Sequence, residues 1–155
     1  MASTYLILHN IRSAENVGSL FRTADAFGVT KIYLTGFTPS PLDRFKRPVS
    51  KIAKTALGAE LVVPWEFGQV HVCIERLKAE GVRVVALEQD ARAVELMAYS
   101  RNGDSALILG NEVDGIDAST LEKADDVVHI PMHGAKESLN VAVAGGIALY
   151  ALTER

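Results

Sequence analysis

Short apolar runs alternate with amphipathic stretches along the whole chain, and this pattern predicts strands and helices in turn. The apolar runs predict strands at 5–8, 31–34, 61–63, 83–87, 106–109 and 126–130. The helical period predicts helices from a Ser13 cap to Gly28 and at 51–57, 69–80, 119–123 and 138–152. Alternating strands and helices are typical of an α/β domain with a mainly parallel sheet flanked by helices.

The last predicted helix differs from the others because residues 140–152 carry no charge. A helix that is apolar all round is normally buried on most sides. Near the end of a small domain its own chain can rarely cover it, so we expect a partner subunit to cover the rest. Small residues would let another backbone approach closely, and they are Ala142, Ala144, Gly145, Gly146 and Ala148. The pattern therefore predicts a homodimer.

Composition and length predict one globular domain over residues 1–155. Of the 155 residues 48% are hydrophobic and 23% are charged, and we find no repeat or linker. The chain shows neither a secretory signal nor an apolar run of roughly 18 residues, so we expect no membrane association. Its single cysteine, Cys73, falls on the apolar stripe of a predicted helix. A buried, unpaired cysteine favours a cytoplasmic location.

The net charge of −3 argues mildly against a nucleic-acid partner, but one segment is basic. In TPSPLDRFKRPVSKIAK, the cations Arg44, Lys46 and Arg47 surround Phe45, and two further lysines follow. One interpretation is a solvated surface loop. The other is an RNA-binding loop in which the cations hold phosphates and the aromatic ring stacks on a base.

Common catalytic and metal-binding motifs are missing. The sequence has no GxGxxG, GxxxxGK[ST] or GxSxG pattern, so dehydrogenase, kinase and hydrolase functions have little support. Its histidines do not form a metal-ligand spacing. His129 and His133 are four residues apart, but Pro131 and Gly134 disfavour a helix that would align them. We therefore expect no metal.

Three clusters of polar residues and glycines occur where strands or loops meet helices. They are NIRSAENVGSLFRTADAFG from Asn10, ALILGNEVDGI around Gly110, and HIPMHGAKESLNVAVAGG before the last helix. The second and third follow predicted strands, where parallel sheets gather ligands. Each cluster alone could also be an ordinary turn or cap. Arg22 projects off the apolar stripe of its helix, which suits either a catalytic role or a solvated arginine paired with Glu15 or Asp25.

Taken together, the clusters resemble the three motifs of the SpoU/TrmH group of RNA methyltransferases in the SPOUT superfamily, from Asn10 to Leu152. The segment IPMHGAKESLNVAVAGGIALY resembles the third motif most closely. The resemblance implies a C-terminal trefoil knot, a bound S-adenosylmethionine and an active site at a dimer interface. Larger members of this group carry an extra N-terminal RNA-binding domain. We expect a single methyltransferase domain without that extension here, which favours tRNA over ribosomal RNA as the substrate.

The resemblance also assigns roles to residues. It places Leu109, Gly110, Ile130, Met132, Ser138 and Leu139 around the methyl donor. It links Arg22, Asn16, Glu112, Ser138 and Asn140 to catalysis, and Arg12 to phosphate binding beside Arg44, Lys46 and Arg47. The implied reaction methylates a ribose 2′-hydroxyl. Arginine is effectively never deprotonated, so we expect Arg22 to stabilise charge instead of acting as a base. A base-methylating relative and a non-catalytic RNA-binding protein are the alternatives.

Overall fold

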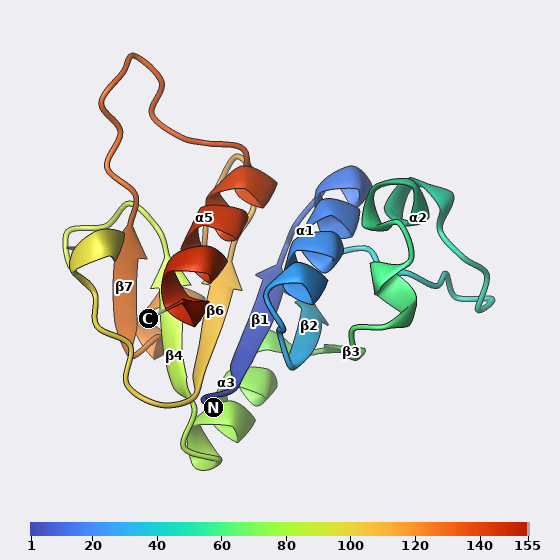
Figure 1. Ribbon diagram of the computed structural model, residues 1–155, viewed down its shortest axis with the longest axis horizontal. Helices are drawn as coiled ribbons and strands as arrows, with labels where there is room; N and C mark the ends of the chain where they lie inside the picture. Colours follow the sequence, from blue (N-terminus) through green and yellow to red (C-terminus); the bar gives the residue numbers. More distant parts are fainter. Residues whose placement is uncertain (155) are drawn as a thin grey trace.

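The computed structural model describes residues 1–154 and contains, within them, one sheet of seven strands in the order β3-β2-β1-β6-β4-β7-β5 (Figure 1). All neighbouring strands are parallel. The strands are β1 (Thr4–His9), β2 (Lys31–Thr35), β3 (Trp65–Gly68), β4 (Arg83–Leu87), β5 (Val94–Glu95), β6 (Ser105–Leu109) and β7 (Asp126–His129). The predicted α/β class with a parallel sheet is confirmed.

Five α-helices and two 3₁₀ turns accompany the strands within residues 1–154, and the last helix, α5, follows the last strand. The helices are α1 (Ala14–Ala26), α2 (Ser50–Ala56), α3 (Val70–Ala79), α4 (Ala118–Lys123) and α5 (Val141–Thr153), and the 3₁₀ turns are η1 (Ala59–Leu61) and η2 (Leu96–Ala98). Figure 1 shows α1 and α5 side by side on one face of the sheet. None of the helices described is long and apolar enough to cross a membrane.

Both faces of the sheet are covered, which explains the nearly continuous apolar runs of its central strands. Successive strand residues point to opposite faces. Leu6 and Leu8 of β1 belong to a core shared with α1, α2 and α5. Ile7 packs on the other face, with Cys73 and Leu77 of α3. Cys73 is buried, as its position on the helix predicted.

Two strands lie in the sheet between strands that precede them in the sequence. β6 lies between β1 and β4, and β7 lies between β4 and β5. The carboxyl ends of β4, β6 and β7 are therefore neighbours, although long connections separate them in sequence. The trefoil knot that the resemblance implies stays a prediction.

Gly145 allows α5 to lie directly on the core. A Cβ atom at this position would lie 2.6 Å from a methyl carbon of Leu109 and 2.7 Å from one of Leu20, closer than carbon atoms pack. Ala148 is also fully buried. These two small residues face their own chain, which corrects the prediction that they face a partner. The exposed side of α5 instead carries Val143 and Ile147.

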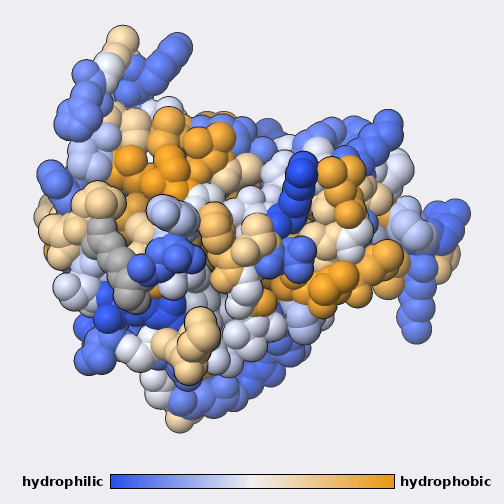
Figure 2. All heavy atoms as spheres, viewed as in Figure 1, coloured by the Kyte–Doolittle hydropathy of each residue, from blue (hydrophilic) through white to orange (hydrophobic). Residues whose placement is uncertain are grey.

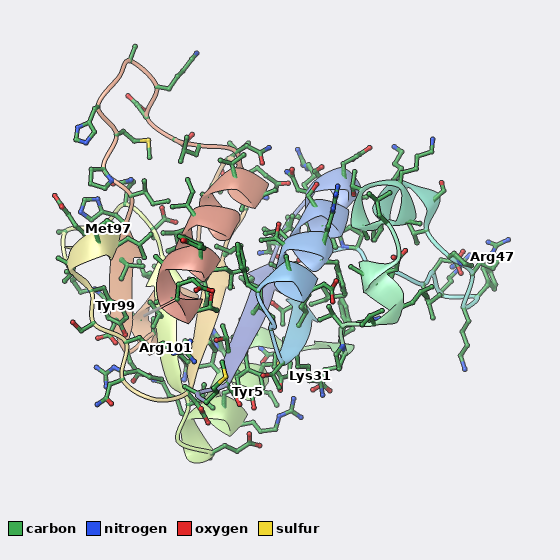
Figure 3. The ribbon with its side chains drawn as sticks, in the orientation of Figure 1. Tyr5, Lys31, Arg47, Met97, Tyr99 and Arg101 are labelled. Atoms are coloured by element: carbon green, nitrogen blue, oxygen red, sulfur yellow. The ribbon has the colours of Figure 1, made fainter. Side chains whose placement is uncertain are left out.

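Arg101 fastens the far end of α5. Its guanidinium donates to the carbonyl of Leu152 at 3.1 Å, to the Thr4 hydroxyl at 2.7 Å and to the carbonyl of Ser3 at 2.5 Å. Figure 3 shows Arg101 close to the start of β1. One side chain thus holds the last turn of α5 against the first strand.

Some predicted boundaries were wrong. Residues 61–63 form no strand, because η1 occupies part of this segment and Leu61 is 85% exposed. The strand comes later, at β3, an edge strand whose side chains are only partly buried. The last helix begins at Val141 instead of residue 138, and Asn140 is its cap. The β5 strand was missed because both its residues are exposed.

Candidate active site

A cleft of about 480 Å³ lies at the carboxyl ends of β4, β6 and β7. Parallel α/β sheets usually bind their ligands at such an edge, and small-molecule sites have volumes of roughly 300–1,000 Å³. All six residues predicted to surround a methyl donor line this cleft, namely Leu109, Gly110, Ile130, Met132, Ser138 and Leu139. The fold thus brings the second and third sequence clusters together. That these residues bind a donor stays a prediction.

The loop after β6 forms one wall of the cleft and closes on itself. The backbone groups of Asn111 and Gly115 exchange hydrogen bonds of 3.1 and 3.0 Å, and Asn111 Oδ1 accepts from the N–H groups of Val113 and Asp114. A Cβ atom on Gly110 would lie 2.6 Å from Cγ1 of Ile116. Glycine at 110 is therefore required for this compact turn.

Two residues that were not predicted hold this loop in place. Glu88, after β4, accepts the N–H of Ile116 at 2.8 Å. His9, at the end of β1, lies 3.0 Å from Asp117 Oδ1 and 2.8 Å from the hydroxyl of Thr35. Since a carboxylate only accepts, we assign the His9 Nε2 atom as the donor to Asp117. The loop is thus tied to two neighbouring strands.

The pKa values of His9 and Asp117 follow from this arrangement. Burial lowers the pKa of His9 below its ordinary value, and the carboxylate of Asp117 only partly offsets this effect. Burial acts to raise the pKa of Asp117, but hydrogen bonds from Ser119 and Thr120, together with His9, lower it to about 2. Asp117 is therefore an ionised cap at the start of α4 near neutral pH.

Glu112 ties the cleft loop to the start of α1. Its carboxylate accepts the N–H groups of Arg12 and Ser13 at 2.8 Å each, and the side-chain amide of Asn16 at 3.2 Å. Burial acts to raise the pKa of Glu112, but these hydrogen bonds outweigh it and the pKa lies below its ordinary value. With both oxygens occupied, Glu112 is placed to orient its neighbours more than to accept a proton.

Asn140 joins this group from the other side. Its amide donates to Asn16 Oδ1 at 3.2 Å, while its own Oδ1 accepts the N–H of Ala142 at 2.9 Å and that of Val143 at 3.3 Å. Asn140 therefore caps α5 and contacts α1 at the same time. Three of the five predicted catalytic residues, Glu112, Asn16 and Asn140, form one hydrogen-bonded chain.

Arg22 does not join that chain. It is exposed on α1 and lines a second hollow of about 720 Å³ between α1 and α5, together with Thr23, Gly146, Ile147 and Tyr150. Within residues 1–154 Arg22 forms no ion pair, so the suggested pairing with Glu15 or Asp25 is not seen. In a single chain the predicted catalytic arginine thus points toward the exposed side of α5 instead of the donor cleft.

The predicted RNA-binding loop has a defined conformation. Asp43 accepts the N–H groups of Phe45 and Arg47 and pairs with the Arg47 guanidinium at 3.0 Å. The guanidinium groups of Arg44 and Arg47 lie 4.8 and 4.9 Å from the centre of the Phe45 ring, which remains 62% exposed. Figure 3 shows Arg47 at the tip of this loop, at the opposite end of the molecule from the loop that follows β7.

Carboxylates dominate the charge of the cleft. Its walls include Glu88, Asp90, Glu112, Asp114 and Glu137, whereas no lysine or arginine of the part described lines it. Among residues 1–154, Asp90 is the only one of these carboxylates that forms an ion pair, with Arg92 at 3.4 Å. The cleft therefore favours a ligand that carries positive charge. No group of histidine, cysteine, aspartate and glutamate residues among residues 1–154 could hold a metal ion.

Known proteins share this sequence and this fold. The model of the SpoU rRNA Methylase family matches residues 3–150. The 23S rRNA (guanosine(2553)-2′-O)-methyltransferase RlmP of Bacillus subtilis strain 168 is 36% identical over 153 residues, which are 97% of this chain and 58% of RlmP. The chain thus spans little more than half the length of that curated relative.

Solved structures give the same picture. The AdoMet-bound rRNA methyltransferase from Sinorhizobium meliloti has a TM-score of 0.88 at 29% identity, over 98% of this chain and 56% of its own. A structure described as giving insights into the 2-OH methylation of C/U34 on tRNA has a TM-score of 0.79 at 27% identity and covers 99% of both chains. The fold of this chain is therefore similar to the folds of these proteins.

Proposed function

The chain belongs to the SpoU rRNA methylase family, and we propose that it transfers a methyl group from S-adenosylmethionine to a ribose 2′-hydroxyl of RNA. One observation carries the proposal. The six residues predicted to surround the methyl donor line a single cleft. The hydrogen bonds from Glu112 through Asn16 to Asn140 run from the wall of this cleft, by way of α1, to the start of α5.

The charge of the cleft supports a sulfonium donor. S-adenosylmethionine carries one positive charge more than its demethylated product, and the cleft walls carry carboxylates but, among residues 1–154, no lysine or arginine. The donor supplies a methyl group that is already activated. The protein then has to place the ribose oxygen in line with the methyl group and stabilise the charge that develops as the hydroxyl proton leaves. We assign the second task to Arg22, with the proton passing to a phosphate or to water.

We propose that a second copy of the chain completes the active site. Arg22 lies in the hollow beside α5, and the exposed face of this helix carries Val143, Ile147 and Tyr150. Figure 2 shows hydrophobic atoms gathered over α5 on this side of the molecule. Pairing through α5 would bury these side chains and would place the Arg22 of one copy near the cleft of the other.

Two further parts of the proposal concern the substrate. The exposed cations Arg44, Lys46 and Arg47, with Arg12 beside Glu112, would hold RNA phosphates, and Phe45 would stack on a base. We propose tRNA as the substrate, in the cytoplasm. The similarity to a structure concerned with tRNA methylation, which covers 99% of both chains, supports tRNA.

The test is methyl transfer from labelled donor to separated tRNA and ribosomal RNA, followed by mapping of the labelled nucleotide. We expect label in tRNA at a linkage that resists alkaline cleavage, because a 2′-O-methyl group removes the attacking hydroxyl. Label on a base would contradict ribose methylation, and label confined to ribosomal RNA would contradict the choice of substrate. RNA binding without donor binding would make this a non-catalytic RNA-binding protein.

A further inference from the structure

The loop between β7 and α5 is held only at its ends. No hydrogen bond joins residues 131–139 to any other residue that the structure describes, and residues 133–140 are exposed. Figure 1 shows this loop projecting from the body of the molecule. Nevertheless, Met132, Glu137, Ser138 and Leu139 line the cleft. The position of one cleft wall thus depends on how the two ends of the loop are fixed.

Asn140 fixes the later end through α5 and Asn16, as described above. At the earlier end Ile130 packs against the core, and one side-chain hydrogen bond holds its backbone. Gln89 donates from its Nε2 atom to the carbonyl of Ile130 at 3.0 Å. Gln89 and Ile130 both line the cleft, and they come from the ends of neighbouring strands.

The hydrogen bond from Gln89 to Ile130 takes the place of a backbone hydrogen bond between β4 and β7. The β4–β7 ladder ends where the N–H of Glu88 donates to the carbonyl of Val128. If the parallel ladder continued, the N–H of Asp90 would donate the next hydrogen bond from the β4 side to the carbonyl of Ile130 on the β7 side. No such bond forms, and the side chain of Gln89 fills that place. Strand pairing has stopped, but the start of the loop is still aligned with β4.

We infer that Gln89 is a positioning residue for the methyl donor, acting through Ile130 on the loop 131–139. The inference rests on the proposed function, because it concerns the same cleft. Gln89 holds the earlier end of the loop so that Met132, Ser138 and Leu139 face the cleft. Without this hydrogen bond the earlier end keeps only the packing of Ile130 on the core and the pairing of His129 with β5, so more of its ordering has to occur when S-adenosylmethionine binds.

The experiment compares Gln89→Ala and Gln89→Glu with the wild-type protein. Alanine removes the side-chain amide that donates the hydrogen bond. Glutamate keeps the size of the side chain but places a carboxylate against the carbonyl of Ile130. One exposed hydrogen bond corresponds to a roughly two- to tenfold change, so we expect the affinity for S-adenosylmethionine to fall by that factor in Gln89→Ala. In Gln89→Glu the same hydrogen bond is lost, but the new carboxylate in the cleft wall attracts the positively charged methyl donor, so we expect a smaller fall. The KM for the donor should rise in step, while kcat and the KM for RNA stay within about twofold.

Trypsin gives a readout that needs no ligand. Lys136 is exposed within the loop, and mass spectrometry identifies cleavage after it. We expect faster cleavage there in both Gln89 variants and protection by bound donor in the wild-type protein. Glu122→Ala, an exposed change on α4, is the control and should alter neither cleavage at Lys136 nor donor affinity.

Several outcomes separate the inference from the proposed function. Wild-type donor affinity together with wild-type cleavage at Lys136 in both Gln89 variants overturns the inference and leaves the proposed function standing. If kcat and the affinity for S-adenosylmethionine fall by the same factor in the Gln89 variants, the positioning role of Gln89 is overturned as well. If the wild-type protein binds no S-adenosylmethionine, the proposed function fails, whereas cleavage at Lys136 still shows whether Gln89 holds the loop.

Discussion

The side-chain amide of Asn140 donates to Oδ1 of Asn16 at 3.2 Å, although 124 positions separate the two residues in sequence. Asn16 lies in the first turn of α1, and Asn140 caps α5, so the pair joins the starts of the two helices on one face of the sheet. Asn16 also donates to Glu112 in the cleft wall. The donor cleft is therefore linked to α1, the helix that carries Arg22.

Substitutions at Asn140 separate its two contacts. Serine caps helices about as well as asparagine does, but it is too short to reach Asn16. We expect Asn140→Ser to keep its free energy of unfolding within about 0.5 kcal/mol of the wild-type value, whereas Asn140→Ala loses about 1 kcal/mol with the cap. In both variants methyl transfer should fall at least about tenfold, the factor that corresponds to 1.4 kcal/mol. Urea unfolding, donor calorimetry and single-turnover assays measure these effects. Wild-type donor affinity and turnover in both variants would refute a functional role for Asn140.

The sequence predicted much of this fold because its strongest patterns come from buried elements. The central strands β1, β4 and β6 are apolar on both faces, and α1 keeps its apolar stripe because only one side of it is buried. The weakly buried edge strands β3 and β5 lack such a pattern and were missed. The exposed run at Leu61 was mistaken for a strand, since hydrophobicity alone does not distinguish core from surface.

The candidate site was predicted only in part. The motif resemblance named the six residues that line the cleft and the three residues that are joined by hydrogen bonds, Glu112, Asn16 and Asn140. It did not identify His9 or Glu88, which hold the cleft loop through single hydrogen bonds from strands far away in sequence. Such contacts leave no periodic signal. The placement of Arg22 outside the cleft was also unforeseen, because the direction of a helix face follows from the packing of α1 against α5.

A charge on the exposed side of α5 should prevent dimer formation. We expect Ile147→Glu to be monomeric and inactive, because burying an unpaired carboxylate costs several kcal/mol. Ile147 is 43% exposed in the single chain, so the variant should still fold. Val72→Glu, on the exposed side of α3, is the matched control and should behave as the wild type does. Sedimentation equilibrium measures the mass. A wild-type protein that is monomeric at micromolar concentration would contradict the proposed dimer.

Removing the cations of the basic loop should weaken RNA binding and reduce its dependence on salt. Replacing Arg44, Lys46 and Arg47 by alanine should lower the slope of log K against log salt by about 0.7 for each lost phosphate contact with a single strand. The affinity for S-adenosylmethionine should stay unchanged, since none of these three residues lines the cleft. Lys123→Ala, which removes a cation that is paired with Glu75, is the control. An unchanged slope in the triple variant would make this a solvated surface loop.

Stability should fall as the pH is lowered below about neutrality, and His9 should cause the first part of the loss. The folded protein holds the pKa of His9 below its ordinary value of 6.5, so the unfolded chain binds more protons and acid favours unfolding from about pH 6.5 downward. Glu112 and Asp117, whose pKa values are also lowered, act in the same direction at lower pH. His9→Gln should flatten the curve below about pH 6.5. Urea unfolding at each pH measures this dependence, and an unchanged slope in His9→Gln would contradict the assignment.

Arg22 offers the sharpest test of the proposed chemistry. If Arg22 stabilises charge that develops at the ribose oxygen, its contribution arises in the transition state, so kcat should fall while donor binding survives. The loss of one such group typically costs about a hundredfold or more in rate. Arg22→Lys keeps the charge without the planar fork and should restore little if two oxygens are held at once.

Arg76→Ala, on α3 and paired with Glu66, removes an arginine from the other side of the sheet and should leave methyl transfer unchanged. Single-turnover assays with Arg22→Ala and Arg22→Lys, with folding followed by circular dichroism, give the result. Near wild-type rates in both variants would make Arg22 an ordinary surface charge, because removing such a charge changes stability by less than about 0.5 kcal/mol and leaves turnover alone.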